Sequence, residues 1–256
     1  MPGSRLEAAL HASPSRFGPL RDSLISFGAF AVLWQLASFV LPAFMVPSWQ
    51  RIASSLAHLH YDNVLVSLAR VIVALIASFA LGMAGALAMY LSERVERFGM
   101  PLVNLVMAVP ATCWIVFSIL WFKGVELRIC FVLVVVCAPI FLVDFLDGMR
   151  GVSRDLRSMV WSFRPGLIQY LVKLLFPAIT PIVLTSLKIN VSQAIRLVTF
   201  AELVGAVSGI GYGLSTAQEM FSVAEVFAWT LVLIVILTLA MELLAHMERR
   251  LLRWRA

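Results

Sequence analysis

Long stretches without a charged residue are the feature that most constrains how this chain can fold. Four of them cover residues 23–50, 71–92, 98–122 and 226–241, and two more, 129–146 and 177–204, contain a few charged side chains. A helix needs about 20 mostly apolar residues to cross the hydrocarbon core of a bilayer. The sequence therefore predicts an all-α, polytopic membrane protein with about six transmembrane helices.

The composition excludes a soluble globular domain as the main fold. Of the 256 residues, 61% are hydrophobic and 13% are charged. Soluble domains have about 45–50% apolar and about 25% charged residues. Six spans leave little chain for a second unit, so we expect a single transmembrane domain over residues 23–247. A cytoplasmic N-terminal tail over 1–22 and a basic cytoplasmic tail over 248–256 are expected to flank it.

The distribution of basic residues predicts the orientation of the chain. The net charge is +6, but 14 of the 20 Lys and Arg fall on segments that share one side of a six-span arrangement. An excess of this kind marks the cytoplasmic side, so both termini are expected in the cytoplasm and nucleic-acid binding is not needed to explain the charge. The fourteen residues are Arg5, Arg16, Arg21, Arg94, Arg97, Arg150, Arg154, Arg157, Arg164, Lys173, Arg249, Arg250, Arg253 and Arg255.

The cysteines and the paired histidines do not predict a metal site. Cys113, Cys130 and Cys137 lie in apolar spans without CxxC spacing, so we interpret them as small packing residues. His58 and His60 are two residues apart and would lie on different faces of a helix. No metal ligand set is expected.

Two segments between spans are expected on the outer side. Residues 48–63 have apolar side chains at helical spacing and predict an interfacial helix. Residues 205–225 form the second segment, a predicted periplasmic loop that begins with Gly205, Gly209, Gly211 and Gly213. We expect a re-entrant turn that leads into a short helix at about 214–221, with Gly209, Gly211 and Tyr212 as candidate gate residues.

The longest inner connection, residues 148–176, is a predicted basic hairpin. Ser153 is expected to cap a helix that runs to about Phe163, and Arg164, Pro165 and Gly166 are expected to break it. The aromatic side chains of this hairpin must pack against something. Both the membrane surface and a partner protein fit that requirement.

A polar face runs along one of the interrupted spans. Lys188, Ser192, Arg196, Thr199 and Glu202 are spaced by three or four residues and therefore share one side of a helix. Because charge in a bilayer is costly, this face should point at protein, water or a solute path. Two interpretations remain open, an internal ion-pair network, for example Arg196 with Asp144 or Glu202, and a basic translocation path that attracts an anion.

From about Trp34 to its end, the chain resembles the membrane permease subunits of binding-protein-dependent ABC importers of the nitrate, sulfonate and taurine type. The resemblance rests on the order and spacing of several short motifs. These are LWQLAS at 33–38, VPS at 46–48, SLARV at 67–71, ILWF at 119–122, LDGMR at 146–150, FPAITPIVLTSLK at 176–188 and AELVGAVSGIGYG at 201–213.

The resemblance implies a type I ABC importer permease in the bacterial inner (cytoplasmic) membrane. Its expected partners are a second permease copy or homologue, a cytoplasmic ABC ATPase dimer, a periplasmic solute-binding protein, membrane lipid and a small solute. The chain contains no GxxxxGKS/T motif, so it is not expected to be an enzyme. ATP and Mg²⁺ would be bound by the ATPase subunits, and the permease itself needs no cofactor.

The resemblance also assigns residues 153–163 to a coupling helix that docks on the ATPase. We expect Trp161 and Phe163 to supply apolar contacts and Arg154 and Arg157 to meet acidic groups. The match is imperfect, because the Glu-Ala-Ala of the family falls on Ser158, Met159 and Val160 and its glycine falls on Arg164. A second departure lies at Met107 and Ala108, where relatives often have Arg-Pro.

A secondary transporter or channel driven by an ion gradient is the main rival function. Its intramembrane charges would be coupling sites, but no repeat of broken helices in matching halves is evident. An intramembrane enzyme is a weaker rival, since the chain has no HExxH motif.

Overall fold

A computed structural model of the chain describes residues 18–42 and 44–253. This part of the chain forms helices and no strand, which confirms the all-α prediction. The helices are α2 (Gly18–Val40), α3 (Trp49–Ala57), α4 (Asp62–Leu91), α5 (Glu93–Ala108), α6 (Ala111–Trp121), α7 (Val125–Arg150), α8 (Arg154–Ser162), α9 (Leu167–Tyr170), the π-helix η1 (Leu171–Leu175), α10 (Phe176–Leu203), α11 (Ile210–Glu219) and α12 (Val223–Leu251).

By length and composition, the described residues contain four clear membrane spans, where the sequence predicts about six. They are Asp62–Leu91, Val125–Arg150, Leu167–Leu203 and Val223–Leu251. A fifth candidate is the pair α5 and α6, which bends by 94° at a short break. Pro110 explains this break, because the residue before a proline is disfavoured in a helix. The apolar part of α2, Ile25–Val40, is shorter than a full span.

The centre of the bundle is the tight contact between α4 and α7. A Cβ atom added to Gly82 of α4 would lie 2.5 Å from Cβ of Phe141 on α7, so the two backbones approach as closely as a glycine permits. Small residues allow such close packing between membrane helices. The rings of Phe79, Phe141 and Phe145 fill the neighbouring space, with centroids 5.2–5.5 Å apart.

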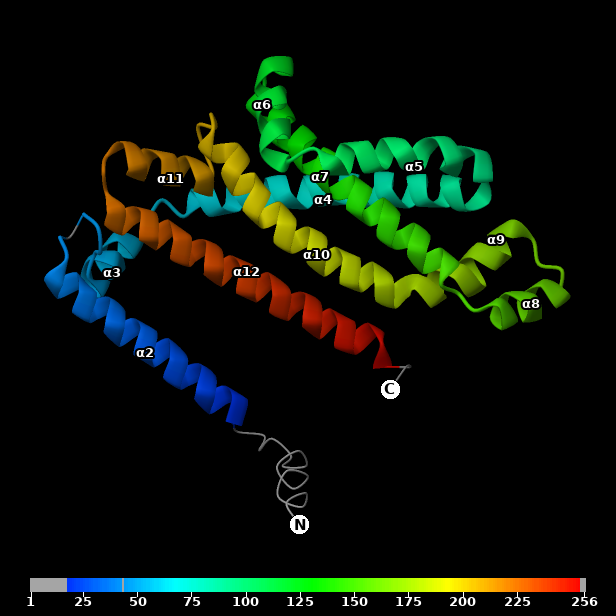
Figure 1. Ribbon diagram of the computed structural model, residues 1–256, viewed down its shortest axis with the longest axis horizontal. Helices are drawn as coiled ribbons and strands as arrows, with labels where there is room; N and C mark the ends of the chain where they lie inside the picture. Colours follow the sequence, from blue (N-terminus) through cyan, green and yellow to red (C-terminus); the bar gives the residue numbers. More distant parts are fainter. Residues whose placement is uncertain (1–17, 43, 254–256) are drawn as a thin grey trace, which may run out of the picture.

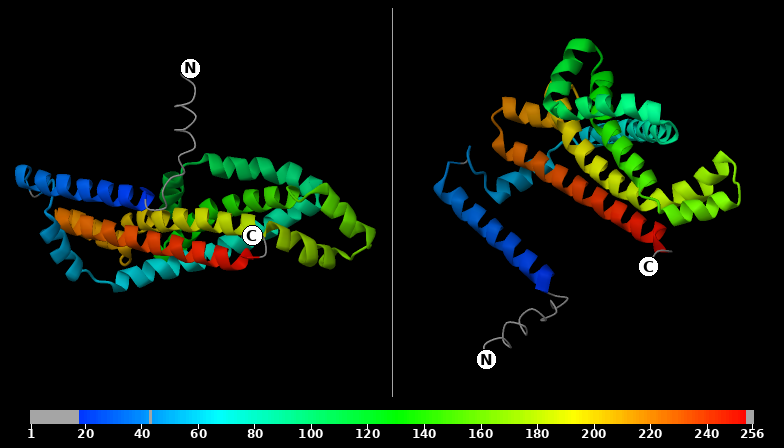
Figure 2. Two further views of the ribbon diagram at one scale, coloured as in Figure 1. Left: turned by 90° about the horizontal axis from the view of Figure 1, so that it is seen from below. Right: turned by 45° about the vertical axis from the view of Figure 1, so that its right-hand side comes forward.

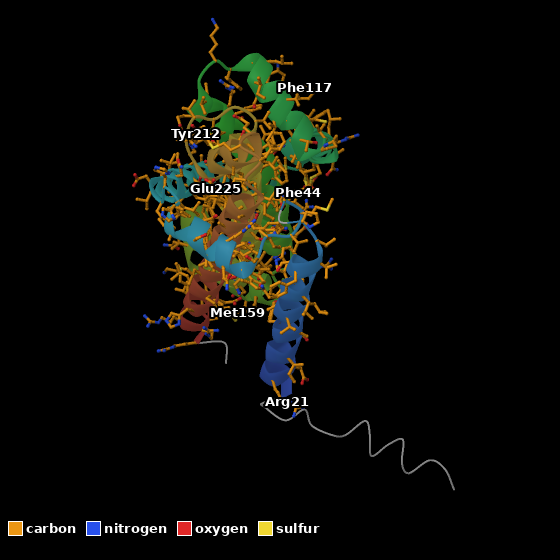
Figure 3. All side chains as sticks on the ribbon, turned by 90° about the vertical axis from the view of Figure 1, so that its left-hand side faces the viewer. Arg21, Phe44, Phe117, Met159, Tyr212 and Glu225 are labelled. Atoms are coloured by element: carbon orange, nitrogen blue, oxygen red, sulfur yellow. The ribbon has the colours of Figure 1, made fainter. Side chains whose placement is uncertain are left out.

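The hairpin of α8 and α9 and the short helix α11 lie at opposite ends of α10 (Figure 1). Met159 on α8 and Tyr212 on α11 accordingly lie at different heights of the molecule in Figure 3. The first residues of α2 and the last residues of α12 lie toward the end that carries the hairpin (Figure 1). One end of the bundle therefore groups the described chain ends with the hairpin.

Helix α2 lies beside the bundle (Figure 2). Most of its described side chains are exposed. Its contacts involve Trp34, whose ring centroid is 5.0 Å from that of Phe227 on α12. Trp34 also donates a hydrogen bond from Nε1 to the carbonyl oxygen of Pro47, 3.0 Å away. Residues 1–17 of the expected N-terminal tail and 254–256 of the expected C-terminal tail lie outside the described residues.

The two segments predicted to lie on the outer side both form helices, one of them with a different start. In the segment 48–63 the helix is α3. The short helix α11 begins at Ile210 rather than near Leu214, so Gly211 and Gly213 lie inside it. A Cβ at Gly213 would lie 2.5 Å from the ring of Trp229, which explains why a glycine occupies that turn.

The inner hairpin follows the predicted pattern at its first helix. Ser153 caps α8, its Oγ accepting a hydrogen bond of 3.3 Å from the backbone N–H of Leu156. The break falls at Arg164, whose φ of 48° lies in the left-handed region. After the break, α9, η1 and α10 follow one another without a gap, and Pro177 lies directly after the π-helical turn.

Candidate functional site

The structure divides the predicted polar face of α10 into residues with different surroundings. Lys188 forms an ion pair with Glu248 of α12, and both side chains are about half-buried. Thr199 is buried and donates a hydrogen bond of 3.0 Å to the carbonyl oxygen of Ile195. These two residues are satisfied within the chain.

Arg196 is the exposed member of this face. Its Nε donates to the carbonyl oxygen of Ser192 at 3.0 Å, and its Nη2 donates to the Ser192 hydroxyl. Among the described residues, no carboxylate lies within ion-pair distance of Arg196, so the expected pairs with Asp144 or Glu202 do not form. Its guanidinium charge is not neutralised by the part of the chain that the structure describes.

A cavity of about 330 Å³ between α10 and α12 opens beside Arg196. Its walls are mainly apolar, and its polar members are Arg196, Thr199 and Thr230. The apolar wall is formed by Ile195, Phe200, Leu203, Leu214, Leu233, Ile234 and Leu237. The arrangement places one free cation at an apolar hollow along a membrane-spanning helix.

Glu202 is fully enclosed in the protein, with no exposed surface. Its carboxylate accepts hydrogen bonds of 2.8 Å from Ser67 Oγ and from Arg70 Nη1, both on α4. It also accepts one of 2.9 Å from the backbone N–H of Gly211 in the first turn of α11. The ion-pair interpretation therefore holds for Glu202, but its partner is Arg70.

Arg70 joins Glu202 to two further segments. Its Nε donates to Glu126 at the start of α7 at 2.9 Å, and its Nη1 donates to the carbonyl oxygen of Ser208 at 2.8 Å. The Arg70 side chain is 6% exposed, whereas that of Glu126 is 71% exposed. We call Ser67, Arg70, Glu126, Glu202 and Gly211 the Glu202 node.

The glycines of the outer loop are required by the Glu202 node. Gly209 has φ of 109°, in the left-handed region that favours glycine, and its N–H donates to Asn63 Oδ1 at 2.9 Å. The N–H of Ile210 donates to Ser67 Oγ at 2.8 Å. Tyr212, the third expected gate residue, is 38% exposed. Gly209 and Gly211 thus belong to one buried cluster, and Tyr212 faces outward from it.

Sequence reasoning missed the α4 members of this cluster. Asn63, Ser67 and Arg70 are spaced by four and three residues, which puts them on one face of α4. Arg70 lies inside the SLARV motif but looked like an ordinary basic residue at a span boundary. A polar stripe on an otherwise apolar span was the signal that could have identified these residues.

The hairpin exposes several of the predicted coupling residues. Met159 is 55% exposed and Phe163 is 79% exposed. Trp161 is half exposed and packs on Tyr170 of α9, with ring centroids 5.5 Å apart. The Tyr170 hydroxyl in turn lies 2.8 Å from the hydroxyl of Tyr90 on α4. The tryptophan therefore links the hairpin to the bundle while the other two side chains point away.

The basic residues of the hairpin differ from one another. Arg157 is half-buried, and its Nη2 donates to the carbonyl oxygens of Met149 and Arg150 at the end of α7. Arg154, Ser158 and Arg164 are exposed. Arg157 thus binds carbonyl oxygens of the last turn of α7. Arg154 is the basic residue of α8 that is left free for a partner.

The comparisons with known proteins agree on one family. The family described as binding-protein-dependent transport system inner membrane component matches residues 76–253. The taurine transport system permease protein TauC of Escherichia coli is 26% identical over 250 residues, covering 91% of this chain and 90% of TauC. The probable ABC transporter permease protein of Haemophilus influenzae is 25% identical over 221 residues, covering 84% and 90%.

A solved structure shows the same fold. An inward-facing conformation of the MetNI methionine ABC transporter superposes with a TM-score of 0.69, covering 74% of this chain and 94% of the solved chain. The sequence identity is 16%, so this likeness concerns the fold.

Proposed function

The chain belongs to the family of binding-protein-dependent transport system inner membrane components and is the transmembrane subunit of an ABC importer, and we propose that it forms half of a translocation path for a small anionic solute. The observation that carries the proposal is Arg196, a cation on a membrane-spanning helix without a carboxylate partner in the described residues. Charge at membrane depth faces a partner or a water-filled path. The names of relatives that transport aliphatic sulfonates and nitrate support an anion, and the taurine of a third relative also carries a sulfonate group.

Arg196 would act by attraction rather than by tight binding. A basic group beside a low-dielectric wall raises the local concentration of an anion. Weak contacts then allow the anion to leave, as conduction requires. Lys188 contributes less to this field, because Glu248 offsets its charge.

We expect Arg196→Gln to lower the uptake of an anionic solute by roughly tenfold, the low end of the enrichment that focused charge gives. Uptake of nitrate and of an aliphatic sulfonate would be measured in proteoliposomes that contain the permease, its ATPase and its binding protein. Thr230→Val is the matched control, since it changes the same cavity without changing charge. Equal losses in Arg196→Gln and Thr230→Val would show that the charge does not act on the solute.

Two features support separate partner proteins. The sequence has no ATP-binding motif, and the hairpin exposes apolar side chains. Two cytoplasmic ABC ATPases would bind α8, a second permease copy or homologue would complete the path, and a periplasmic binding protein would deliver the solute. Both termini and the hairpin would then be cytoplasmic, with α11 on the periplasmic side. The grouping of the described chain ends with the hairpin supports a shared side for all three (Figure 1), and the excess of Lys and Arg on these segments supports the cytoplasmic side.

The orientation predicts from which side of the membrane a reagent reaches each end of the helix bundle. In a background with the native cysteines replaced by alanine, a membrane-impermeant thiol reagent should modify Glu219→Cys in right-side-out vesicles. It should modify Ser158→Cys only in inverted vesicles. Both positions are exposed, so their accessibility depends on sidedness and not on burial. Labelling of Ser158→Cys from the outside would overturn the orientation.

A further inference from the structure

The Glu202 node encloses the carboxylate of an ion pair completely. Glu202 has no exposed surface, and Ser67, Arg70 and Gly211 occupy its carboxylate. A buried ion pair often stabilises a fold no better than apolar side chains of the same volume would. Its best-attested benefit is to specify one arrangement of the elements that it joins. The question is therefore which arrangement this pair specifies.

The node fixes the beginning of α11. The first N–H groups of a helix have no acceptor within the helix itself. Here a side chain of α4 or α10 accepts a hydrogen bond from each N–H of Gly209, Ile210 and Gly211. The Glu202 carboxylate also lies at the positive end of the α11 dipole. These three bonds set both the position and the register of the helix.

Short turns with positive φ join α11 to the helices on either side of it. Before the helix, Gly205 and Gly209 have φ of 124° and 109°. After it, Phe221 has φ of 54° and is 89% exposed. Backbone hydrogen bonds close the turn after α11, so the direction of the helix depends on this turn and on its packing contacts. On its far side those contacts are with α12, where Gly213 packs against Trp229.

We propose that Ser67, Arg70 and Glu202 form a positioning cluster that makes α4, the outer end of α10 and α11 one moving unit, so that α11 does not swing independently when the outer gate opens. This inference rests on the proposed function, in which α11 lies on the periplasmic side of the translocation path. Arg70 is bound to Glu202 inside and to the exposed Glu126 of α7 outside. The contact with Glu126 is the one that can part when α7 moves, because its carboxylate is already in contact with solvent.

The test measures the distance between α4 and α11 directly and needs no solute. Spin labels would be placed at Leu65→Cys on α4 and Glu219→Cys on α11, both exposed positions, in the assembled permease and ATPase complex in lipid nanodiscs. Helix α11 has 10 residues, about 15 Å, so a tilt at its start displaces the label at its end measurably. Double electron–electron resonance gives the width of the distance distribution with and without ATP.

In the wild type, we expect one narrow distribution that is the same with and without ATP. Glu202→Gln keeps the shape of the side chain but removes the ion pair, and it should broaden the distribution at least twofold. Glu126→Gln is the matched control, because it leaves the Arg70–Glu202 pair intact and should keep the distribution narrow. A wild-type width in Glu202→Gln would overturn the proposal.

Ser67→Ala is a second test variant for the case in which Glu202→Gln does not fold and cannot be purified from membranes. It removes the bonds to Ile210 and Glu202 without unpairing a buried charge, and it should also broaden the distribution. A narrow distribution in Ser67→Ala would overturn the proposal equally. Failure of the wild-type complex to couple ATP to uptake would instead refute the proposed function, so the two failures are distinguishable.

Discussion

Replacing Gly211 with alanine is expected to destabilise the permease more than any other single methyl addition to the outer loop. The added Cβ would lie 2.6 Å from Cβ of Glu202 and 2.7 Å from the backbone nitrogen of Leu203, and it would lie closer still to the carbonyl oxygen of Thr199. Two of these neighbours are backbone atoms of α10, which cannot turn aside as a flexible side chain can. Overpacking of this kind costs about 3 kcal/mol or more.

The measurement is the thermal midpoint of the purified permease in detergent. A cost of about 3 kcal/mol corresponds to a fall of roughly 6–12 °C for a chain of this size. Gly124→Ala is the control, because an added Cβ there meets nothing within 4 Å and its φ of −83° suits any residue. If the two variants melt together, the close approach of α11 to α10 is not as the structure shows.

The spans were predictable because they depend on local properties of the chain. A run of apolar residues must be long enough to cross the bilayer whatever it packs against, and α4, α7, α10 and α12 meet that condition. The Ser153 cap was predictable for the same reason, since its bond reaches only to Leu156. The count of spans was less secure, because the apolar part of α2 is short and α5 and α6 bend at Pro110.

The Glu202 node was not predictable, because its bonds join residues far apart in the sequence. Ser67 and Glu202 are 135 positions apart, and helical spacing says only that Glu202 shares a face with Arg196. Which residues of that face are covered depends on how α4 and α11 pack on α10. The sequence pattern therefore predicted the polar face. The packing of the helices buries Glu202 and leaves Arg196 exposed.

The start of α11 shows how tertiary packing overrides local preference. Glycine is an unfavourable residue inside a helix, so the sequence places the helix after the four glycines. In the structure, Gly211 and Gly213 lie inside α11. Glycine is needed at both positions because only a hydrogen atom fits against Thr199 and Trp229. The anchoring bonds at the start of α11 offset the low propensity of the two glycines.

Truncating the free apolar side chains of α8 is expected to abolish ATP-driven uptake while the permease stays folded. Met159 and Phe163 are 55% and 79% exposed and make no contact that holds the bundle together. If they enter a groove on the ATPase, each should contribute about 2 kcal/mol, as buried apolar anchors do at interfaces. Met159→Ala with Phe163→Ala should then weaken ATPase binding by roughly a thousandfold. Binding of purified ATPase to the permease in nanodiscs measures this directly.

Two control variants separate docking from the other roles that the hairpin could have. Phe98→Ala on α5 removes a side chain that is 74% exposed but lies outside the hairpin, and it should leave ATPase affinity unchanged. Trp161→Ala removes the contact with Tyr170, so it should loosen the hairpin and weaken binding less than the double variant does. If Met159 and Phe163 rest instead on the membrane surface, the double variant will bind the ATPase with wild-type affinity. That outcome would require the exposed Arg154 or the second limb of the hairpin to carry the ATPase contact.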